Sequence, residues 1–156
     1  MKLKYAFLIT SMLMSCSALA IPNLWSYEFG QGNTTYDIEN QNGASFTINC
    51  TGNPDENNTL QHSVTLSLPK GETVNSYDKN DPSIVVVIDD EQYGIPSSLG
   101  WRNADNAWYN FIEAIGKATT FDVYLNNKPV GTWKPSKKNV SKVLNGIQTC
   151  ASSTYE

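Results

Sequence analysis

Three consecutive acids, Asp89, Asp90 and Glu91, are candidates for acid–base catalysis. Consecutive side chains of an extended chain point to opposite faces, so these three carboxylates cannot all converge on one substrate. Glycoside hydrolysis needs two carboxyl groups about 5 to 9.5 Å apart in a cleft, and Asp122 or Glu113 could supply the second one. The pattern favours a solvated turn. The alternative is a small secreted hydrolase that uses acids from the 89–91 turn and Asp122.

Other patterns for catalysis or metal binding are incomplete. His62, the only histidine, begins an expected strand without a G-x-S-x-G nucleophile elbow, and the chain has no phosphate-binding loop or dinucleotide fingerprint. Asp78, Asn80 and Asp81 offer oxygen donors, but a calcium loop of the EF-hand type also needs a glycine turn and a distal glutamate. One histidine and one pair of cysteines cannot complete a zinc site. We therefore predict no metal, no cofactor and no enzymatic activity.

The first twenty residues, MKLKYAFLITSMLMSCSALA, indicate where the protein works. They combine a basic start, an apolar core over residues 5–14 and small residues at Ala18 and Ala20, which is the pattern of a secretory signal peptide. We predict cleavage after Ala20 and a periplasmic or secreted protein, with residues 21–156 as a single domain.

A lipid anchor is the alternative use of the same segment. Residues 13–16, LMSC, are similar to a lipobox, and cleavage before Cys16 would make that cysteine a lipidated anchor. No apolar run reaches the roughly 20 residues that a membrane helix needs, so we predict no transmembrane segment.

The exported chain is acidic. Removal of residues 1–20 leaves nine basic and 15 acidic residues, a formal charge of −6. Because a nucleic-acid backbone attracts positive charge, nucleic acid is not expected as a partner.

Cys50 and Cys150 are the two cysteines that remain after export. An even number of cysteines in an oxidising compartment indicates a disulfide, and two cysteines permit one pairing. Closing a loop of about 100 residues would remove on the order of 4.7 kcal/mol of unfolded-state entropy. We predict a Cys50–Cys150 bond that joins an early strand to the C-terminus.

Most of the chain alternates apolar and polar residues with a period of two, as half-buried strands do. In GASFTINCTG, the residues Phe46, Ile48 and Cys50 share one face. The run IVVVI over residues 84–88 is apolar on both faces, so we expect it to be the most buried strand. Further strands are expected over residues 24–30, 34–38, 61–69, 121–125 and 130–133.

The opening segment predicts a hairpin. Trp25, Tyr27 and Phe29 fall on one face of LWSYEFG, and after a glycine-rich break Tyr36 and Ile38 resume the alternation.

Two helices are expected in the second half of the chain. Residues 103–118, NADNAWYNFIEAIGKA, place their large apolar side chains at helical spacing, which indicates an amphipathic helix lying on the sheet. A shorter helix should follow Pro135. The fold class is therefore α+β, a mostly antiparallel β-sheet with one amphipathic helix, one short C-terminal helix and a single disulfide.

Lysines gather near the C-terminus. Residues 128–142 hold five lysines and no acid. This segment could meet an acidic partner, anionic lipid head groups or a polyanionic wall polymer, and the alternative is an ordinary solvated helix face.

An aromatic pair lies next to these lysines. If the hairpin that follows residues 121–125 turns at residues 127–128, Tyr124 and Trp133 share the face opposite Phe121. Either a helix covers both side chains, or they form an exposed anchor of the kind that interfaces favour. The candidate binding residues are Tyr124, Trp133, Lys134, Lys137 and Lys138.

A scattered pattern spans most of the exported chain. Its segments are Phe46-x-Ile48-x-Cys50, Val64-Thr65-Leu66, Trp108-x-x-Phe111, Ala118-x-x-Phe121-x-Val123-Tyr124, and Val143-Leu144 followed by Cys150. The pattern resembles a periplasmic accessory family associated with type VI secretion, in which a strand cysteine and a C-terminal cysteine flank a helix with a tryptophan. The resemblance implies a non-enzymatic envelope protein that works through partners.

The leading hypothesis is therefore a small exported binding or accessory protein of the bacterial envelope, with a protein partner. Within that class the sequence leaves two roles open, a secretion-system accessory factor and an immunity or inhibitor protein that blocks an enzyme.

Overall fold

The computed structural model describes residues 21–154 of the 156-residue chain. The predicted signal segment, with its cleavage position and the alternative anchor at Cys16, lies outside the described residues.

The strands in chain order are β1 (Ser26–Gly30), β2 (Asn33–Glu39), β3 (Ser45–Thr51), β4 (Ser63–Ser67), β5 (Thr73–Asn75), β6 (Ile84–Ile88), β7 (Glu91–Gly94), β8 (Phe121–Leu125) and β9 (Lys128–Trp133). The helices are α1 (Arg102–Ile115), α2 (Lys137–Val143) and the 3-10 helix η1 (Ile147–Cys150). The predicted long helix and short C-terminal helix are thus confirmed, and η1 adds one turn before the chain ends.

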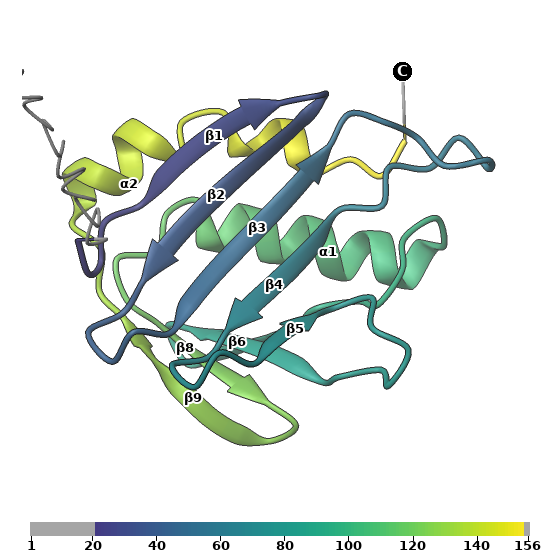
Figure 1. Cartoon of the computed structure of the whole chain (residues 1–156). Helices are drawn as coiled ribbons and strands as arrows, with labels where there is room; N and C mark the ends of the chain where they lie inside the picture. The colour runs from purple at the N-terminus through teal and green to yellow at the C-terminus, as the bar shows by residue number, and fades with distance from the viewer. Residues whose placement is uncertain (1–20, 155–156) are drawn as a thin grey trace, which may run out of the picture.

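The strands form two antiparallel sheets. One has the order β1-β2-β3-β4-β5, and the other has the order β7-β6-β8-β9. In Figure 1, α1 crosses the far side of the first sheet and α2 lies beside β1. The predicted α+β class with mostly antiparallel strands is confirmed.

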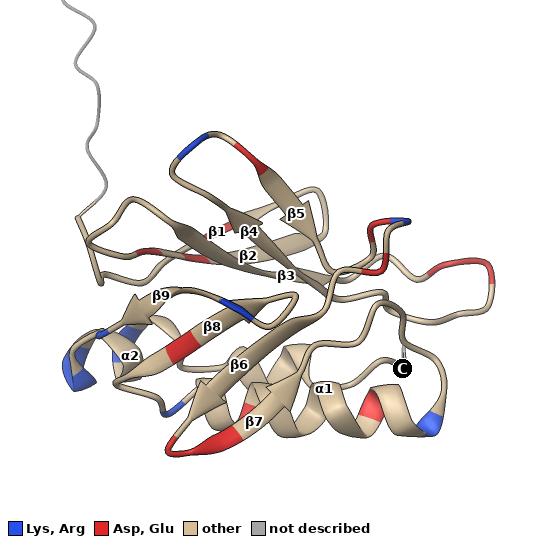
Figure 2. Cartoon of the chain, turned by 90° about the horizontal axis from the view of Figure 1, so that it is seen from below, with Lys and Arg blue, Asp and Glu red and all other residues tan. Residues whose placement is uncertain are grey.

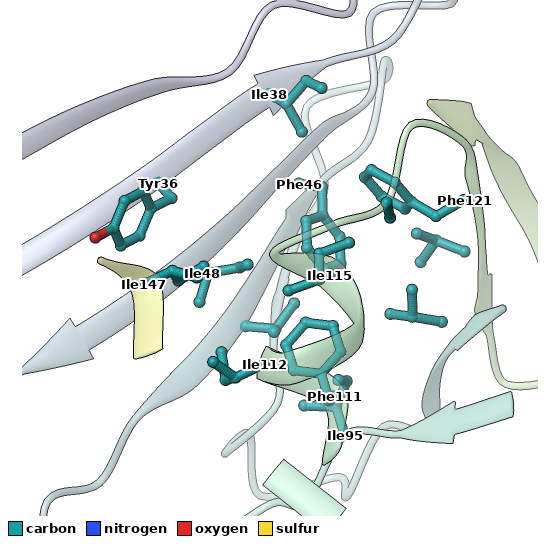
Figure 3. Close-up of a cluster of buried hydrophobic side chains, with 14 of the residues drawn as sticks. Tyr36, Ile38, Phe46, Ile48, Ile95, Phe111, Ile112, Ile115, Phe121 and Ile147 are labelled. Carbon is teal, nitrogen blue, oxygen red and sulfur yellow. The ribbon is translucent and has the colours of Figure 1, made fainter. Parts of the chain in front are cut away.

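The core fills the space between the inner faces of the sheets and α1. The Phe46 ring on β3 lies 6.4 Å from Phe111 of α1 and 5.4 Å from Phe121 of β8. Phe121 in turn stacks on Trp133 at 5.4 Å with the two rings nearly parallel. All four side chains are 0 or 1% exposed. Figure 3 shows Phe46, Phe111 and Phe121 in one cluster with several buried isoleucines.

The disulfide joins Cys50 at the end of β3 to Cys150 in η1, as predicted. The two Cα atoms lie 5.3 Å apart although 100 residues separate them in sequence. The bond therefore fixes the C-terminal segment against the first sheet.

Strand β6 departs from its expected burial. Ile84, Val86 and Ile88 are buried, but Val85 and Val87 are only half-buried. No helix or sheet among residues 21–154 covers their face, so this strand is covered on one side only.

The β8–β9 hairpin has a different register from the expected one. Phe121 lies opposite Trp133, and Asp122 lies opposite Thr132. The chain turns at Asn126 and Asn127, both with positive φ, as a two-residue hairpin turn requires. Trp133 therefore points into the core.

Candidate binding surface

Four of the five clustered lysines lie on and just before α2. Lys134 follows β9, Lys137 and Lys138 open α2, and Lys142 lies in its last turn. All four are exposed, and Figure 2 shows the basic residues gathered on α2 while acidic residues gather at the β6–β7 turn. We call Lys134, Lys137, Lys138 and Lys142 the basic surface.

Hydrogen bonds from its own N-cap residue and from the segment before β1 fix the short helix that carries this surface. Ser136 precedes the helix, and its hydroxyl accepts a hydrogen bond from the Asn139 N–H at 3.2 Å, as an N-cap serine does. The side chain of Asn139 accepts from the Trp25 N–H at 2.7 Å and donates to the Trp25 carbonyl at 3.0 Å. The N–H of Lys134 donates to the side chain of Asn23 at 2.8 Å.

The charges of the basic surface are not paired. The ion pair found among residues 21–154 is Lys117 with Glu113, on α1. The four lysines therefore present uncompensated positive charge on an otherwise acidic domain, which favours contact with an anionic partner.

The structure does not bring the aromatic candidates to this surface. Trp133 is 0% exposed, and its indole N–H donates to the Ile38 carbonyl at 3.2 Å. The expectation that it could be an exposed anchor is wrong, because the register places it opposite Phe121 rather than Asp122. Tyr124 is half-buried and pairs with Pro129, at the opposite end of β9 from Lys134.

Some of the acids do share a hollow. A hollow of about 770 Å³ between β7 and α1 is lined by Asp89, Glu91 and Glu113, among others. The Tyr93 hydroxyl donates to Glu91 at 2.6 Å. This hydrogen bond, together with partial burial, raises the pKa of Tyr93. Glu113 is held by Lys117 at 3.4 Å.

The remaining acids of the alternative hydrolase lie elsewhere. Asp90 borders a separate hollow on the outer face of the second sheet, together with Tyr124. Asp122 accepts a hydrogen bond from the Thr132 hydroxyl across the β8–β9 pair. Neither residue lines the hollow that holds Asp89 and Glu91.

His62 fastens the C-terminal segment to the first sheet. Its Nδ1 accepts from the Thr51 N–H at 3.1 Å, and its Nε2 lies 2.8 Å from the Ser152 carbonyl. A carbonyl can only accept, so Nε2 carries the proton and the ring is neutral. The ring stacks on Trp108 at 5.8 Å. Burial lowers the pKa of His62 below its usual value.

Sequence reasoning did not identify two features beside the basic surface. Tyr27 and Phe29 are 60% and 74% exposed on β1, although they alternate with the buried Trp25. The sequence also does not predict the contact made by Asn139, because a single asparagine in a helix gives no sign of a hydrogen bond to a residue more than a hundred positions earlier.

These features define a small disulfide-tied α+β domain with a basic helix fixed beside a strand. The chain belongs to the YfjT family, whose sequence pattern matches residues 23–144. It is 51% identical over 140 residues to the uncharacterized protein YkfB of Escherichia coli (strain K12), with 90% of each chain covered. It is 50% identical over 143 residues to the uncharacterized protein YfjT of the same organism, with 92% of each chain covered. No solved structure matches the chain.

Proposed function

We propose that the protein is a small exported, non-enzymatic binding or accessory protein of the bacterial envelope that contacts an acidic protein partner through the basic surface. The observation that carries this proposal is the group of four exposed lysines on a segment that Asn139 and Asn23 hold against the domain. A surface held in one geometry loses little conformational entropy when it binds.

The predicted export and the disulfide support the envelope as the place of action. The Cys50–Cys150 bond is of the kind that forms in oxidising compartments. Among residues 21–154, no helix combines the length and the apolar character that crossing a membrane would require. Periplasmic or secreted protein and lipid-anchored protein both stay proposals.

The accessory and immunity roles both stay open under this proposal. Each role requires a specific contact with a partner protein and does not require catalysis. The family and the names of its relatives make no reference to type VI secretion, so that association stays a prediction.

For the alternative hydrolase, the structure limits the set of acids that could act together. It would use Asp89, Glu91 and Glu113 in the hollow between β7 and α1, since Asp122 lies outside that hollow. Glu113 already pairs with Lys117, and Glu91 already accepts from Tyr93. The binding function therefore has the stronger structural support.

A pull-down from envelope extract tests the proposal. The bait is the mature, disulfide-bonded protein, compared with a Lys137→Glu/Lys138→Glu double variant. A Lys70→Glu/Lys79→Glu variant is the matched control, because these lysines are exposed on loops away from α2. We expect a retained partner that is lost with the first variant, kept with the control and released by salt. Partners that are identical for all three baits would contradict the proposal.

A further inference from the structure

β1 has one free edge. In the first sheet it pairs only with β2, through the two-residue turn at Gln31 and Gly32. The residues flanking such a turn exchange backbone hydrogen bonds, and the bonded pairs then recur at every second residue. The backbone groups of Glu28 and Gly30 therefore face β2. Those of Tyr27 and Phe29 point away from the sheet.

The preceding position on the same edge is already occupied. Trp25 follows the same alternation, and the Asn139 side chain bonds both its N–H and its carbonyl. The Asn139 side chain thus makes the two hydrogen bonds with the Trp25 backbone that an added strand would make. The next two positions, Tyr27 and Phe29, have no such partner among the described residues.

Two large aromatic side chains of this edge are exposed. Tyr27 and Phe29 are 60% and 74% exposed, and Phe29 borders a hollow of about 460 Å³ whose wall includes Leu60 and Gln148. Free edges of sheets are usually protected by lysine, proline or short length. β9 has Lys128 and Pro129, and β5 has three residues, whereas β1 has five residues and neither lysine nor proline.

The charge beside the edge indicates what would bind there. Asn139 lies on α2 between Lys138 and Lys142, so the end of the open edge is next to the basic surface. An extended segment that pairs with Tyr27 and Phe29 would bring one of its ends to these lysines. That end would be favoured if it were acidic.

A second copy of this chain fits the edge poorly in the register that uses both outward residues of both copies. In the symmetric antiparallel pairing with Tyr27 opposite Phe29, Glu28 would face Glu28 of the second copy, and like charges directly opposite are destabilising. That pairing would also bring the uncharged residues 30–33 of the copy towards α2, with no acid to meet the lysines.

From these observations we infer that β1 accepts an added strand, an extended segment of a partner protein with alternating apolar residues and an acidic end beside α2. The inference rests on the proposed binding function and specifies its mode. Backbone hydrogen bonds to Tyr27 and Phe29 would supply affinity, and pockets for alternate side chains would supply selectivity.

The test uses a displayed library of random ten-residue peptides, selected on the mature disulfide-bonded protein. We expect selected peptides to alternate β-branched or aromatic residues with polar ones and to carry Asp or Glu near one end. In selection on a Lys138→Glu/Lys142→Glu variant, the acidic preference should be lost. An unchanged acidic preference, or selected peptides with no alternation, would overturn the inference.

Hydrogen exchange of the wild-type protein locates the binding site without any substitution. In the free protein the amides of Tyr27 and Phe29 should exchange quickly and those of Glu28 and Gly30 slowly. A selected peptide should slow both fast amides at least tenfold. A peptide that binds and leaves them fast would refute strand addition.

A proline variant separates this inference from the proposed function. Phe29→Pro removes one outward N–H without touching the bonds to β2, and Phe29→Ala retains that N–H as a control. We expect at least tenfold weaker peptide binding for Phe29→Pro than for Phe29→Ala. If Phe29→Pro still retains the envelope partner that Lys137→Glu/Lys138→Glu loses, strand addition is wrong and the proposed function stands.

Discussion

The side-chain amide of Asn139 bonds both backbone groups of Trp25, a residue that lies 114 positions earlier in the chain. This contact attaches the helix with the basic surface to the residue that immediately precedes β1. It also marks the point where the edge of that strand changes from covered to open. Asn139 therefore acts together with the bond between Asn23 and Lys134 in fixing the position of the lysines.

Replacement of Asn139 by alanine should destabilise the protein. The change removes two hydrogen bonds and leaves the partly buried backbone of Trp25 unpaired, which costs about 1–3 kcal/mol. The free energy of unfolding in urea measures the loss. Asn145→Ala, at an exposed position after α2, is the matched control and should change stability by less than about 0.5 kcal/mol. Equal effects of the two substitutions would contradict the role given to Asn139.

Reduction of the disulfide should lower the melting temperature clearly. Loss of a native disulfide from a small exported domain costs about 2–5 kcal/mol, and the loop closed by Cys50 and Cys150 is long. Thermal unfolding with and without a reducing agent measures the change. The double variant Cys50→Ala/Cys150→Ala should be insensitive to the reducing agent, which separates the bond from other effects. An unchanged melting curve of the wild-type protein would rule out a stabilising bond.

Substitution of Trp133 tests whether this tryptophan is a core residue or a binding anchor. Trp133→Ala should cost about 3–5 kcal/mol of unfolding free energy, because it empties a space that is packed against Phe121. Trp101, which is 56% exposed, is the control, and Trp101→Ala should cost less than about 1 kcal/mol. A stable Trp133→Ala protein would show that the register of β8 and β9 is wrong.

Stability should decrease in mildly acidic solution because of His62. Burial lowers the pKa of His62 in the folded protein, so the unfolded chain takes up this proton at a higher pH than the folded chain. The stability from the neutral ring is complete above the unfolded value of about 6.5 and is lost as the pH falls from there through the folded pKa. Protonation of Nδ1 would also break the bond from the Thr51 N–H.

Urea unfolding at pH 7.5 and 5.5 measures this dependence. His62→Gln provides the comparison, because it removes the titrating ring and retains polar atoms. We expect a larger loss of stability at pH 5.5 for the wild-type protein than for the variant. Identical losses would mean that folding does not lower the pKa of His62.

Alternation in the sequence predicted most strands and the inner face of the first sheet. Phe46, Ile48 and Cys50 are buried on β3 as expected, since apolar residues at every second position must share one face. Helical spacing likewise predicted α1, with Trp108 and Phe111 in the core. These features depend on local periodicity, which a single sequence contains.

The errors have physical causes that periodicity does not contain. The β8–β9 register depends on a turn at Asn126 and Asn127 and on Val130, which has no partner on β8. A shift of one residue moves Trp133 from one face to the other. Val85 on β6 lies on the outer face of its sheet. Phe29 on β1 lies on the inner face of the first sheet but at its edge, where it borders an open hollow. Alternation indicates a face without indicating how far the covering layer extends.

Site-specific photocrosslinking in the producing cells shows whether α2 contacts a partner. A photoreactive amino acid at position 138 lies on the basic surface, and the same residue at position 79 lies on an exposed loop elsewhere. We expect a discrete crosslinked partner from position 138 and none from position 79. No adduct from position 138, or the same adduct from both positions, would contradict a function based on contact through α2.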